Sequence, residues 1–284
     1  MSKRGKIIEE KFFKYLMAVF TYSLIGLLFL ILYEIFKKGF PALSWDMISQ
    51  VPKGGFYFGK EGGILNAIVG SLYLALGASL LSILISLPVA IFISISLVKH
   101  EKWQHIIRLI LDLLWGVPPI VYGAFMFAIM LWFGMKASLL AGIITIALLI
   151  TPVMIRAMDE VLRNIPLGLL ESSLSLGATR YETAVIFFKQ ALPGIATAFL
   201  LGFAKGVGDT AAVLFTVGYT DYIPRSVMEP AATLPLSIFF QLSSPIEEVK
   251  ARAYAAAVVL TGIILIISVF SRYLSSRVSK NTIS

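Results

Sequence analysis

The sequence predicts an all-α integral membrane protein with about six transmembrane helices. Hydrophobic residues make up 58% of the 284 residues, charged residues only 14%, and the mean hydropathy is +0.88. Soluble domains carry about 25% charged residues, so this composition indicates that lipid is the solvent. A membrane-spanning helix needs about 20 apolar residues, and six such runs with their loops occupy the chain. We therefore expect a single transmembrane domain over residues 1–284, without a separate soluble catalytic domain.

Six apolar runs define the expected spans. They lie near residues 14–36, 65–97, 108–133, 137–157, 193–217 and 253–275. Basic residues precede the first run, as in a secretory signal peptide. The run is longer than the roughly 7–15 apolar residues of such a signal, and no small-residue cleavage site is evident. We therefore expect the first run to be retained as a transmembrane helix.

The distribution of Lys and Arg predicts the orientation of these helices. With the N-terminus inside, 15 of the 24 basic residues fall in inner segments, eight in outer segments, and one, Lys205, within a span. Inner loops of membrane proteins carry the excess of positive charge. We therefore expect a multi-pass protein of the cell inner (cytoplasmic) membrane with both termini in the cytoplasm. Because the basic residues lie in short segments between apolar runs, the net charge of +8 favours orientation in a lipid membrane over nucleic-acid binding.

The residue types that the chain lacks exclude several kinds of chemistry. It has no cysteine, which rules out disulfides, thiol catalysis and cysteine-based metal sites. The two histidines, His100 and His105, share one short polar loop and make a poor metal site. The glycine-rich segment 53–63 lacks the residue order of a phosphate-binding P-loop and is expected to be an external turn. We predict no catalytic residue, no metal ligand and no cofactor, and the chain is not expected to be an enzyme.

The longest inner loop, residues 158–192, carries signals for two short helices. The stretch 164–177 begins with Asn and an early Pro and ends in Gly, which are helix start and stop signals. A capping box opens a second helix over 179–189, and Pro193 then introduces the fifth span. Glycine suits the turn between two helices because it adopts positive φ without strain. An apolar ridge is expected to face a cytoplasmic partner, formed by Leu169, Leu170, Leu174 and Leu176.

This loop resembles the EAA loop of binding-protein-dependent ABC importer permeases. The resemblance rests on Glu171-Ser172-Ser173-Leu174-Ser175-Leu176-Gly177, followed by Ala191-Leu192-Pro193-Gly194-Ile195. Serines replace the family's two alanines, and Lys189-Gln190 stands where the family has Leu-Pro. The resemblance implies coupling helices that dock in a groove on an ATPase subunit. The implied coupling residues are Glu171, Ser172, Ser173, Leu174 and Gly177; an ordinary helix–turn–helix connection between spans is the alternative.

Further segments are similar to phosphate permeases of the PstA type within this superfamily. These segments are 62–71, 116–123, 204–211, 233–238 and 253–257. In 116–123, Pro119 replaces the family's serine, and in 204–211 the family's Arg and Glu become Lys205 and Asp209. The resemblance implies a type I ABC importer permease fold and inorganic phosphate as the substrate.

Three charged residues fall within the expected spans: Asp112, Lys205 and Asp209. A charge at the centre of a span costs at least about 2.5–3.5 kcal/mol on insertion scales, so such residues are candidates for function. Lys205 and Asp209 are four residues apart, which places them on one face of the expected fifth helix. Either they form a structural pair, or they line the substrate pathway together with Gly208 and Thr210. In the second case Lys205 attracts phosphate and Asp209 accepts a proton from its hydroxyl, whereas Asp112 is expected to form an interfacial or coupling salt bridge.

Together these observations predict a transport subunit without its own ATPase site. The resemblance implies an ATP-binding cassette ATPase dimer that binds the ATP, an extracytoplasmic substrate-binding protein, and a second permease subunit that makes the pore a heterodimer. A permease for another oxyanion, such as molybdate, sulfate or phosphonate, is the nearest alternative. A secondary transporter without an ATPase is an alternative of a different class, and a membrane-embedded enzyme is a third.

Overall fold

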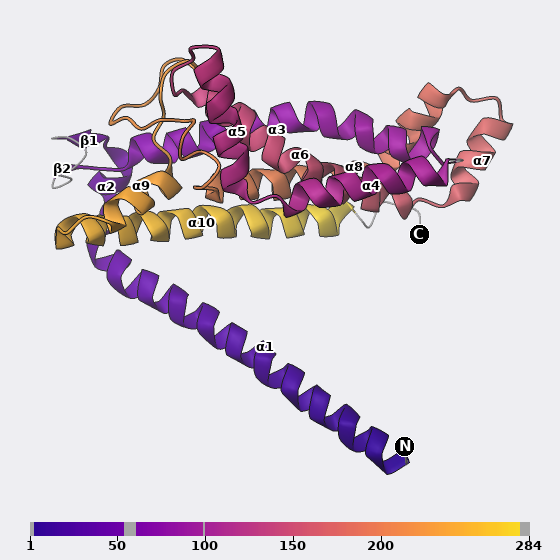
Figure 1. Cartoon of the computed structure of the whole chain (residues 1–284), viewed down its shortest axis with the longest axis horizontal. Helices are drawn as coiled ribbons and strands as arrows, with labels where there is room; N and C mark the ends of the chain where they lie inside the picture. Colours follow the sequence, from indigo (N-terminus) through magenta and orange to yellow (C-terminus); the bar gives the residue numbers. More distant parts are fainter. Residues whose placement is uncertain (1–2, 54–60, 99, 279–284) are drawn as a thin grey trace.

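The computed structural model describes residues 3–53, 61–98 and 100–278, which are mostly helical (Figure 1). The α-helices are α1 (Lys3–Gly39), α2 (Trp45–Ser49), α3 (Leu65–Ile91), α4 (Glu101–Gly116), α5 (Pro119–Trp132), α6 (Leu139–Arg163), α7 (Leu167–Ser175), α8 (Arg180–Gly208), α9 (Leu234–Leu242) and α10 (Glu247–Val278). A 3-10 turn (Phe40–Ala42) follows α1, and a π-helix (Phe92–Ser96) extends α3. The predicted all-α class is confirmed.

Five helical segments of the described chain are long and apolar enough to cross a membrane. They are Glu9–Ala42, Leu65–Ser96, Leu139–Arg163, Arg180–Gly208 and Glu247–Tyr273. A sixth consists of α4 and α5 together, which are bent by 91° where they meet. The expected number of about six spans is therefore confirmed. In Figure 1, α3, α6 and α10 run along the long axis, with α7 at one end and α2 and α9 at the other.

Helix α1 diverges from the bundle toward its N-terminal end (Figure 1). Its most apolar stretch of 18 residues is not buried at all by the rest of the chain. The helix is attached at its other end, where a Cβ on Gly39 would lie 2.5 Å from the carbonyl oxygen of Tyr254 in α10. Lys38 also places its ammonium 5.1 Å from the centre of the Tyr254 ring. Glycine at position 39 thus permits close approach to α10.

The core lies where α3 packs against α6, and hydroxyl groups tie the two helices together. Thr151 of α6 donates a hydrogen bond from Oγ1 to Ser82 Oγ of α3 at 3.1 Å. Ser86 of α3 donates from Oγ to the Thr151 carbonyl at 3.3 Å. Small residues and interhelical hydrogen bonds hold helices together in lipid, where the hydrophobic effect between helices is absent. This polar seam explains why two apolar spans associate here.

The expected third span, 108–133, is not one straight helix. Helix α4 ends at Gly116, and α5 begins at Pro119 after a 91° bend. Val117 and Pro118 are extended (ψ 127° and 136°) because each precedes a proline, which disfavours the α conformation. The composition of the run predicted a crossing, whereas the two prolines divide it.

The expected fifth span, 193–217, is wrong at both ends. Helix α8 already begins at Arg180 and continues through Pro193, so the predicted second short helix merges with the span. Proline is tolerated inside membrane helices because surrounding groups satisfy the freed backbone carbonyl. Helix α8 ends at Gly208, because Asp209 is extended (φ −82°, ψ 127°). The residues expected to complete the span instead begin an irregular segment, 209–233.

This irregular segment satisfies the first backbone N–H groups of α6. The Leu139 N–H donates to the Glu229 carbonyl at 2.8 Å, and the Leu140 N–H donates to the Val227 carbonyl at 2.7 Å. The first N–H groups of a helix have no partner within the helix. Non-helical backbone at such a place needs partners inside the protein, and the two segments supply each other's hydrogen bonds.

The turn predicted over 53–63 is described only at its flanks. There β1 (Pro52–Lys53) pairs antiparallel with β2 (Glu61–Gly62), so the chain reverses between them. Residues 54–60 lie outside the described part of the chain. The reversal is consistent with the expected turn.

Candidate functional site

The turn between α7 and α8 contains the EAA-like glycine. Gly177 has φ +86°, in the left-handed region that only glycine enters without strain. Its N–H donates to the Leu174 carbonyl at 3.0 Å, and the Ala178 N–H donates to the Ser173 carbonyl at 3.1 Å. These two bonds are those of a Schellman motif, which satisfies the last carbonyls of a helix. The positive φ expected for this glycine is confirmed.

The capping box expected at the start of the next helix is also present. Thr179 donates its N–H to Glu182 Oε2 at 2.7 Å, and the Glu182 N–H donates to Thr179 Oγ1 at 3.3 Å. A second contact joins the two helices, because Ser173 Oγ lies 3.3 Å from Thr183 Oγ1 in a buried position. Local hydrogen bonds therefore shape the turn itself, and a buried hydroxyl pair joins the two helices on either side of it.

The four leucines expected to form one ridge are divided between two environments. Leu170 is buried (6% exposed) and Leu169 packs against the core, so both face the protein. Leu174 is 46% exposed and Leu176 is 88% exposed, so both are accessible to a partner. The predicted four-leucine ridge is wrong; two leucines remain.

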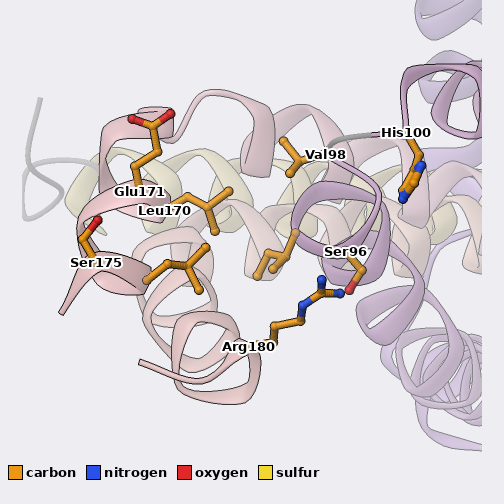
Figure 2. A pocket seen from close by; sticks show the side chains of 9 residues that line it. Ser96, Val98, His100, Leu170, Glu171, Ser175 and Arg180 are labelled. Atoms are coloured by element: carbon orange, nitrogen blue, oxygen red, sulfur yellow. The ribbon is translucent and has the colours of Figure 1, made fainter. Parts of the chain in front are cut away.

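An open cavity of about 650 Å³ lies between α7 and the junction of α3 with α4 (Figure 2). Its apolar lining comes from Ile95, Val98, Leu170 and Leu174. Its polar lining comes from Ser96, His100, Glu171, Ser175 and Arg180. In Figure 2, Glu171 and His100 lie at opposite edges of this cavity. Glu171 and Ser172 are both exposed, and the Ser172 hydroxyl donates to the Gly168 carbonyl at 2.6 Å within α7.

Lys205 lies in the last turn of α8 and is half-buried. Among the described residues it forms no hydrogen bond and no ion pair. The neighbouring glycines differ from each other. A Cβ on Gly206 would lie 3.2 Å from Ile146 Cγ2, so this glycine serves the close packing of α8 on α6. A Cβ on Gly208 would meet only Ile264 Cδ1, at an ordinary 3.7 Å, and Gly208 is exposed.

The sequence predicted that Asp209 and Lys205 share a helix face, and this prediction is wrong. It is the first residue after α8, and its Oδ1 accepts a hydrogen bond from the Ala212 N–H at 2.8 Å. Within the described chain, no ion pair joins Asp209 to Lys205. The structure therefore brings Lys205, Gly208, Asp209 and half-buried Thr210 together at one helix end, but it does not form the expected pair.

Sequence reasoning singled out Asp112 but missed three charged residues near it. Arg108 donates from Nε to Asp159 Oδ2 at 2.9 Å and from Nη2 to Asp159 Oδ1 at 3.1 Å. Arg156 Nε lies 2.8 Å from Asp112 Oδ1, and Arg156 Nη1 lies 3.6 Å from Asp159 Oδ2. The salt bridge expected for Asp112 is confirmed. Spacing could have revealed the network, since each helix carries an Arg and an Asp three or four positions apart.

The described residues contain no candidate metal site. No group of three or more His, Asp or Glu side chains in this part of the chain could hold a metal ion. The α7–α8 turn, the Lys205–Thr210 helix end and the α4–α6 charge network are the features on which a function can rest.

The chain belongs to the family of binding-protein-dependent transport system inner membrane components. The model of this family matches residues 82–280, which include both the coupling turn and Lys205. A solved structure of the MetNI methionine ABC transporter in an inward-facing conformation has a TM-score of 0.61 at 18% identity, covering 76% of this chain and 95% of that chain. A bacterial alginate ABC transporter has a TM-score of 0.58 at 16% identity, covering 98% and 99%. The fold is that of a type I ABC importer permease, and membership of this family makes the chain a multi-pass permease subunit rather than the ATPase.

Within this family, the chain is similar to proteins named phosphate transport system permease protein PstA. The protein from Pasteurella multocida is 32% identical over 254 residues, which are 88% of each chain. The protein from Haemophilus influenzae is 31% identical over 255 residues, with the same coverage. A probable PstA from Methanocaldococcus jannaschii is 32% identical over 276 residues, which are 95% of each chain. The resemblance inferred from short segments thus extends over nearly the whole sequence.

Proposed function

We propose that this chain is one transmembrane subunit of an ATP-driven importer that translocates inorganic phosphate. The observation that carries the proposal is its similarity to permeases named for phosphate transport, at 31–32% identity over at least 88% of each chain. An extracytoplasmic binding protein delivers the substrate, and a second, different permease subunit completes the pore. An ATP-binding cassette ATPase dimer binds and hydrolyses the ATP, since this sequence has no P-loop signature.

The ATPase docks on the α7–α8 turn in this proposal. Leu174 and Leu176 offer exposed apolar surface for a groove on the ATPase, and Glu171 offers an exposed carboxylate. Ser172, Ser173 and Gly177 shape the turn that presents them, through the hydrogen bonds and the positive φ described above. The same turn is tied to α6 and α8, so force applied to it reaches two membrane spans.

The substrate passes the end of α8 in this proposal. Lys205 is a half-buried cation with no hydrogen bond or ion pair among the described residues, its charge acts on nearby Asp209, and a desolvated ammonium attracts an anion strongly. Gly208 leaves the adjacent surface open, and Thr210 brings a hydroxyl close by. Asp209 keeps one oxygen on the Ala212 N–H, and its second oxygen accepts a proton from the substrate hydroxyl. A carboxylate acceptor favours an anion that still carries a proton.

That preference separates phosphate from two of the alternative oxyanions. Sulfate and molybdate carry no proton at neutral pH, so they cannot donate to Asp209, whereas phosphate can. A phosphonate shares this property and remains the closest competitor. A secondary transporter, the alternative from another class, would move its substrate without any ATPase.

The decisive experiment is uptake by vesicles that contain the complete importer. We expect labelled phosphate to enter only when ATP is hydrolysed, and labelled sulfate and molybdate to enter at background rates. Unlabelled phosphonate added in excess tests the remaining competitor. Phosphate uptake that persists with a hydrolysis-deficient ATPase would contradict an ATP-driven importer, and preferential uptake of another oxyanion would reassign the substrate.

The proposal also places the chain in the inner membrane with both termini in the cytoplasm. The chain has no native cysteine, so single cysteines can be introduced and labelled without background. Ser175 in α7 and Ser243 after α9 are both exposed and lie in segments at opposite ends of the molecule (Figure 1). We expect Ser175→Cys to react only with reagent on the cytoplasmic side and Ser243→Cys only with reagent outside. Labelling of both from one side would contradict the proposed topology.

A further inference from the structure

The charge network between α4 and α6 is the starting point of a continuous line of contacts. Asp159 is fully shielded from solvent, and Arg108 holds it with two hydrogen bonds. Asp159 lies one turn before the end of α6, and only three residues separate that helix from α7. The connection is tight, because the Ile165 N–H donates to the Leu162 carbonyl and both side chains are buried. The connection between Asp159 and α7 is therefore short and packed.

Helix α4 depends on this network for its position. Leu111 is the only residue of α4 that is buried. A second polar tie exists at its N-terminal end, where Gln104 Nε2 donates to the Ile93 carbonyl at 3.0 Å. The bidentate bond between Arg108 and Asp159 has fixed geometry as well as strength. It therefore sets the register of α4 against α6.

The 91° elbow between α4 and α5 is braced. Tyr122 of α5 donates from its hydroxyl to the Leu114 carbonyl of α4 at 2.8 Å. Pro118 and Pro119 restrict the backbone at the corner itself. Two helices joined by a restricted corner and a cross-brace turn as one body, so displacement of α4 becomes displacement of α5.

Helix α5 touches the turn that holds Asp209. A Cβ on Gly123 would lie 2.5 Å from the Ala212 carbonyl oxygen, so the helix and this backbone are in direct contact. The N–H of the same Ala212 donates to Asp209. Phe127 of α5 and Phe215 add a ring contact with centroids 6.0 Å apart. Helix α5 therefore contacts the backbone and a side chain of the segment that follows Asp209 in the proposed substrate site.

We propose that Arg108 and Asp159 are positioning residues for transport, and that the α4–α5 elbow they fix relays movement of the coupling turn to the Asp209 turn. The proposal rests on the function proposed above. Its steps are the Asp159–Arg108 bond, the Leu114–Tyr122 brace, and the Gly123–Ala212 contact. Buried ion pairs contribute little to stability, so stabilisation of the fold does not by itself account for this network.

The test measures substrate moved per ATP hydrolysed by the complete importer in vesicles. The double variant Arg108→Met/Asp159→Leu removes one charge of each sign and leaves the Arg156–Asp112 pair intact. We expect it to assemble and to keep its ATPase activity while transport per ATP falls at least about fivefold, the lower range of measured coupling between sites. Tyr122→Phe removes only the brace and should lower the ratio in the same direction. Arg108→Lys keeps the charge without the bidentate bond and should fall between the double variant and the parent.

A direct measurement covers the case in which the double variant assembles poorly. Spin labels at exposed positions 124 in α5 and 148 in α6 report the distance between these helices. We expect this distance to change between the ADP state and a trapped ATP state, and the change to shrink in Tyr122→Phe. A distance that responds to ATP equally in the parent and in Tyr122→Phe would overturn the relay through the elbow.

A matched control separates this proposal from general damage. Ser82→Ala removes a hydroxyl of α3 that contacts Thr151 and Met154 of α6 as well as Ser86, none of them on the proposed line, and should leave transport per ATP unchanged. If Gly177→Pro uncouples the importer but the double variant and Tyr122→Phe do not, the relay is wrong and the proposed coupling turn stands. If the relay variants uncouple and Gly177→Pro does not, transport depends on the elbow but not on movement of the α7–α8 turn, and the relay as proposed is overturned.

Discussion

Helices α7 and α8 both end at a glycine-containing turn, but the two ends are built in different ways. At the end of α7, Gly177 takes φ +86°, nothing lies within 4 Å of its Cβ position, and the closing hydrogen bonds come from the preceding turn. At the end of α8, Asp209 is extended and holds Ala212, which is itself pressed against α5. The first turn is local and exposed. The second is fixed by segments far away in the sequence.

The difference explains why sequence motifs described one end well and the other poorly. A Schellman turn followed by a capping box needs only the residues that form it, so the pattern predicts the geometry. The turn after α8 exists because the chain must satisfy its backbone groups against α5 and α6. An open turn suits docking of a partner, whereas a half-buried helix end with a cation that forms no ion pair among the described residues suits binding of an anion.

The largest effect is expected at the end of α8. If Lys205 attracts the substrate, Lys205→Met should abolish phosphate uptake in vesicles while the importer still assembles with its ATPase. Lys205 has no ion pair in the described chain, but its charge acts on nearby Asp209, so its loss removes a favourable charge close to that carboxylate. Uptake near the parent rate would remove Lys205 from the proposed pathway.

Asp209 provides the control for that variant. Asp209→Asn keeps an oxygen to accept from the Ala212 N–H, whereas Asp209→Leu removes it. We expect both Lys205→Met/Asp209→Asn and Lys205→Met/Asp209→Leu to assemble without transporting. Recovery of uptake in either double variant would indicate that the two charges serve the structure alone.

The coupling turn should respond with lost coupling rather than lost hydrolysis. Proline cannot adopt the positive φ of Gly177, and a charge at Leu174 replaces exposed apolar surface that a partner would cover. We expect Gly177→Pro and Leu174→Glu to insert normally and to hydrolyse ATP without moving phosphate. Phosphate uptake and ATP hydrolysis, measured on the same vesicles at equal abundance, give the answer. Unchanged transport per ATP in both variants would mean that this turn does not dock the ATPase.

The smallest effect isolates the backbone of the same turn. Alanine at Gly177 meets no neighbouring atom, so its cost is the left-handed conformation alone, about 1–2 kcal/mol. Gly168 is the matched control, since it is also free of neighbours but lies in the first turn of α7. There alanine should be neutral or stabilise by about 0.5–1 kcal/mol. Thermal unfolding of the purified subunit should therefore shift downward for Gly177→Ala and not for Gly168→Ala.

The membrane spans show the same division between local and long-range information. Composition and run length predicted about six apolar spans, and the described chain has five such helices and one broken pair. The 91° break was missed because a run of apolar residues does not reveal direction, although Val117-Pro118-Pro119 contained the signal. The early end of α8 was missed because residues 210–217 carry no charge and continue the apolar run, although Gly206, Gly208 and Asp209 contained the signal.

The sequence by itself determined that this chain is a membrane protein, that it has about six apolar spans, and which turn carries the EAA-like motif. Each of these depends on composition or on interactions between residues that are close together in the sequence, so the sequence pattern is sufficient to predict it. Only the tertiary structure decided that Lys205 and Asp209 do not pair. It also decided that Asp159 is buried between two arginines, and that α5 rests on the turn holding Asp209. Those outcomes depend on which backbone and side-chain groups meet after the helices pack, because in lipid every polar group must find a partner within the protein.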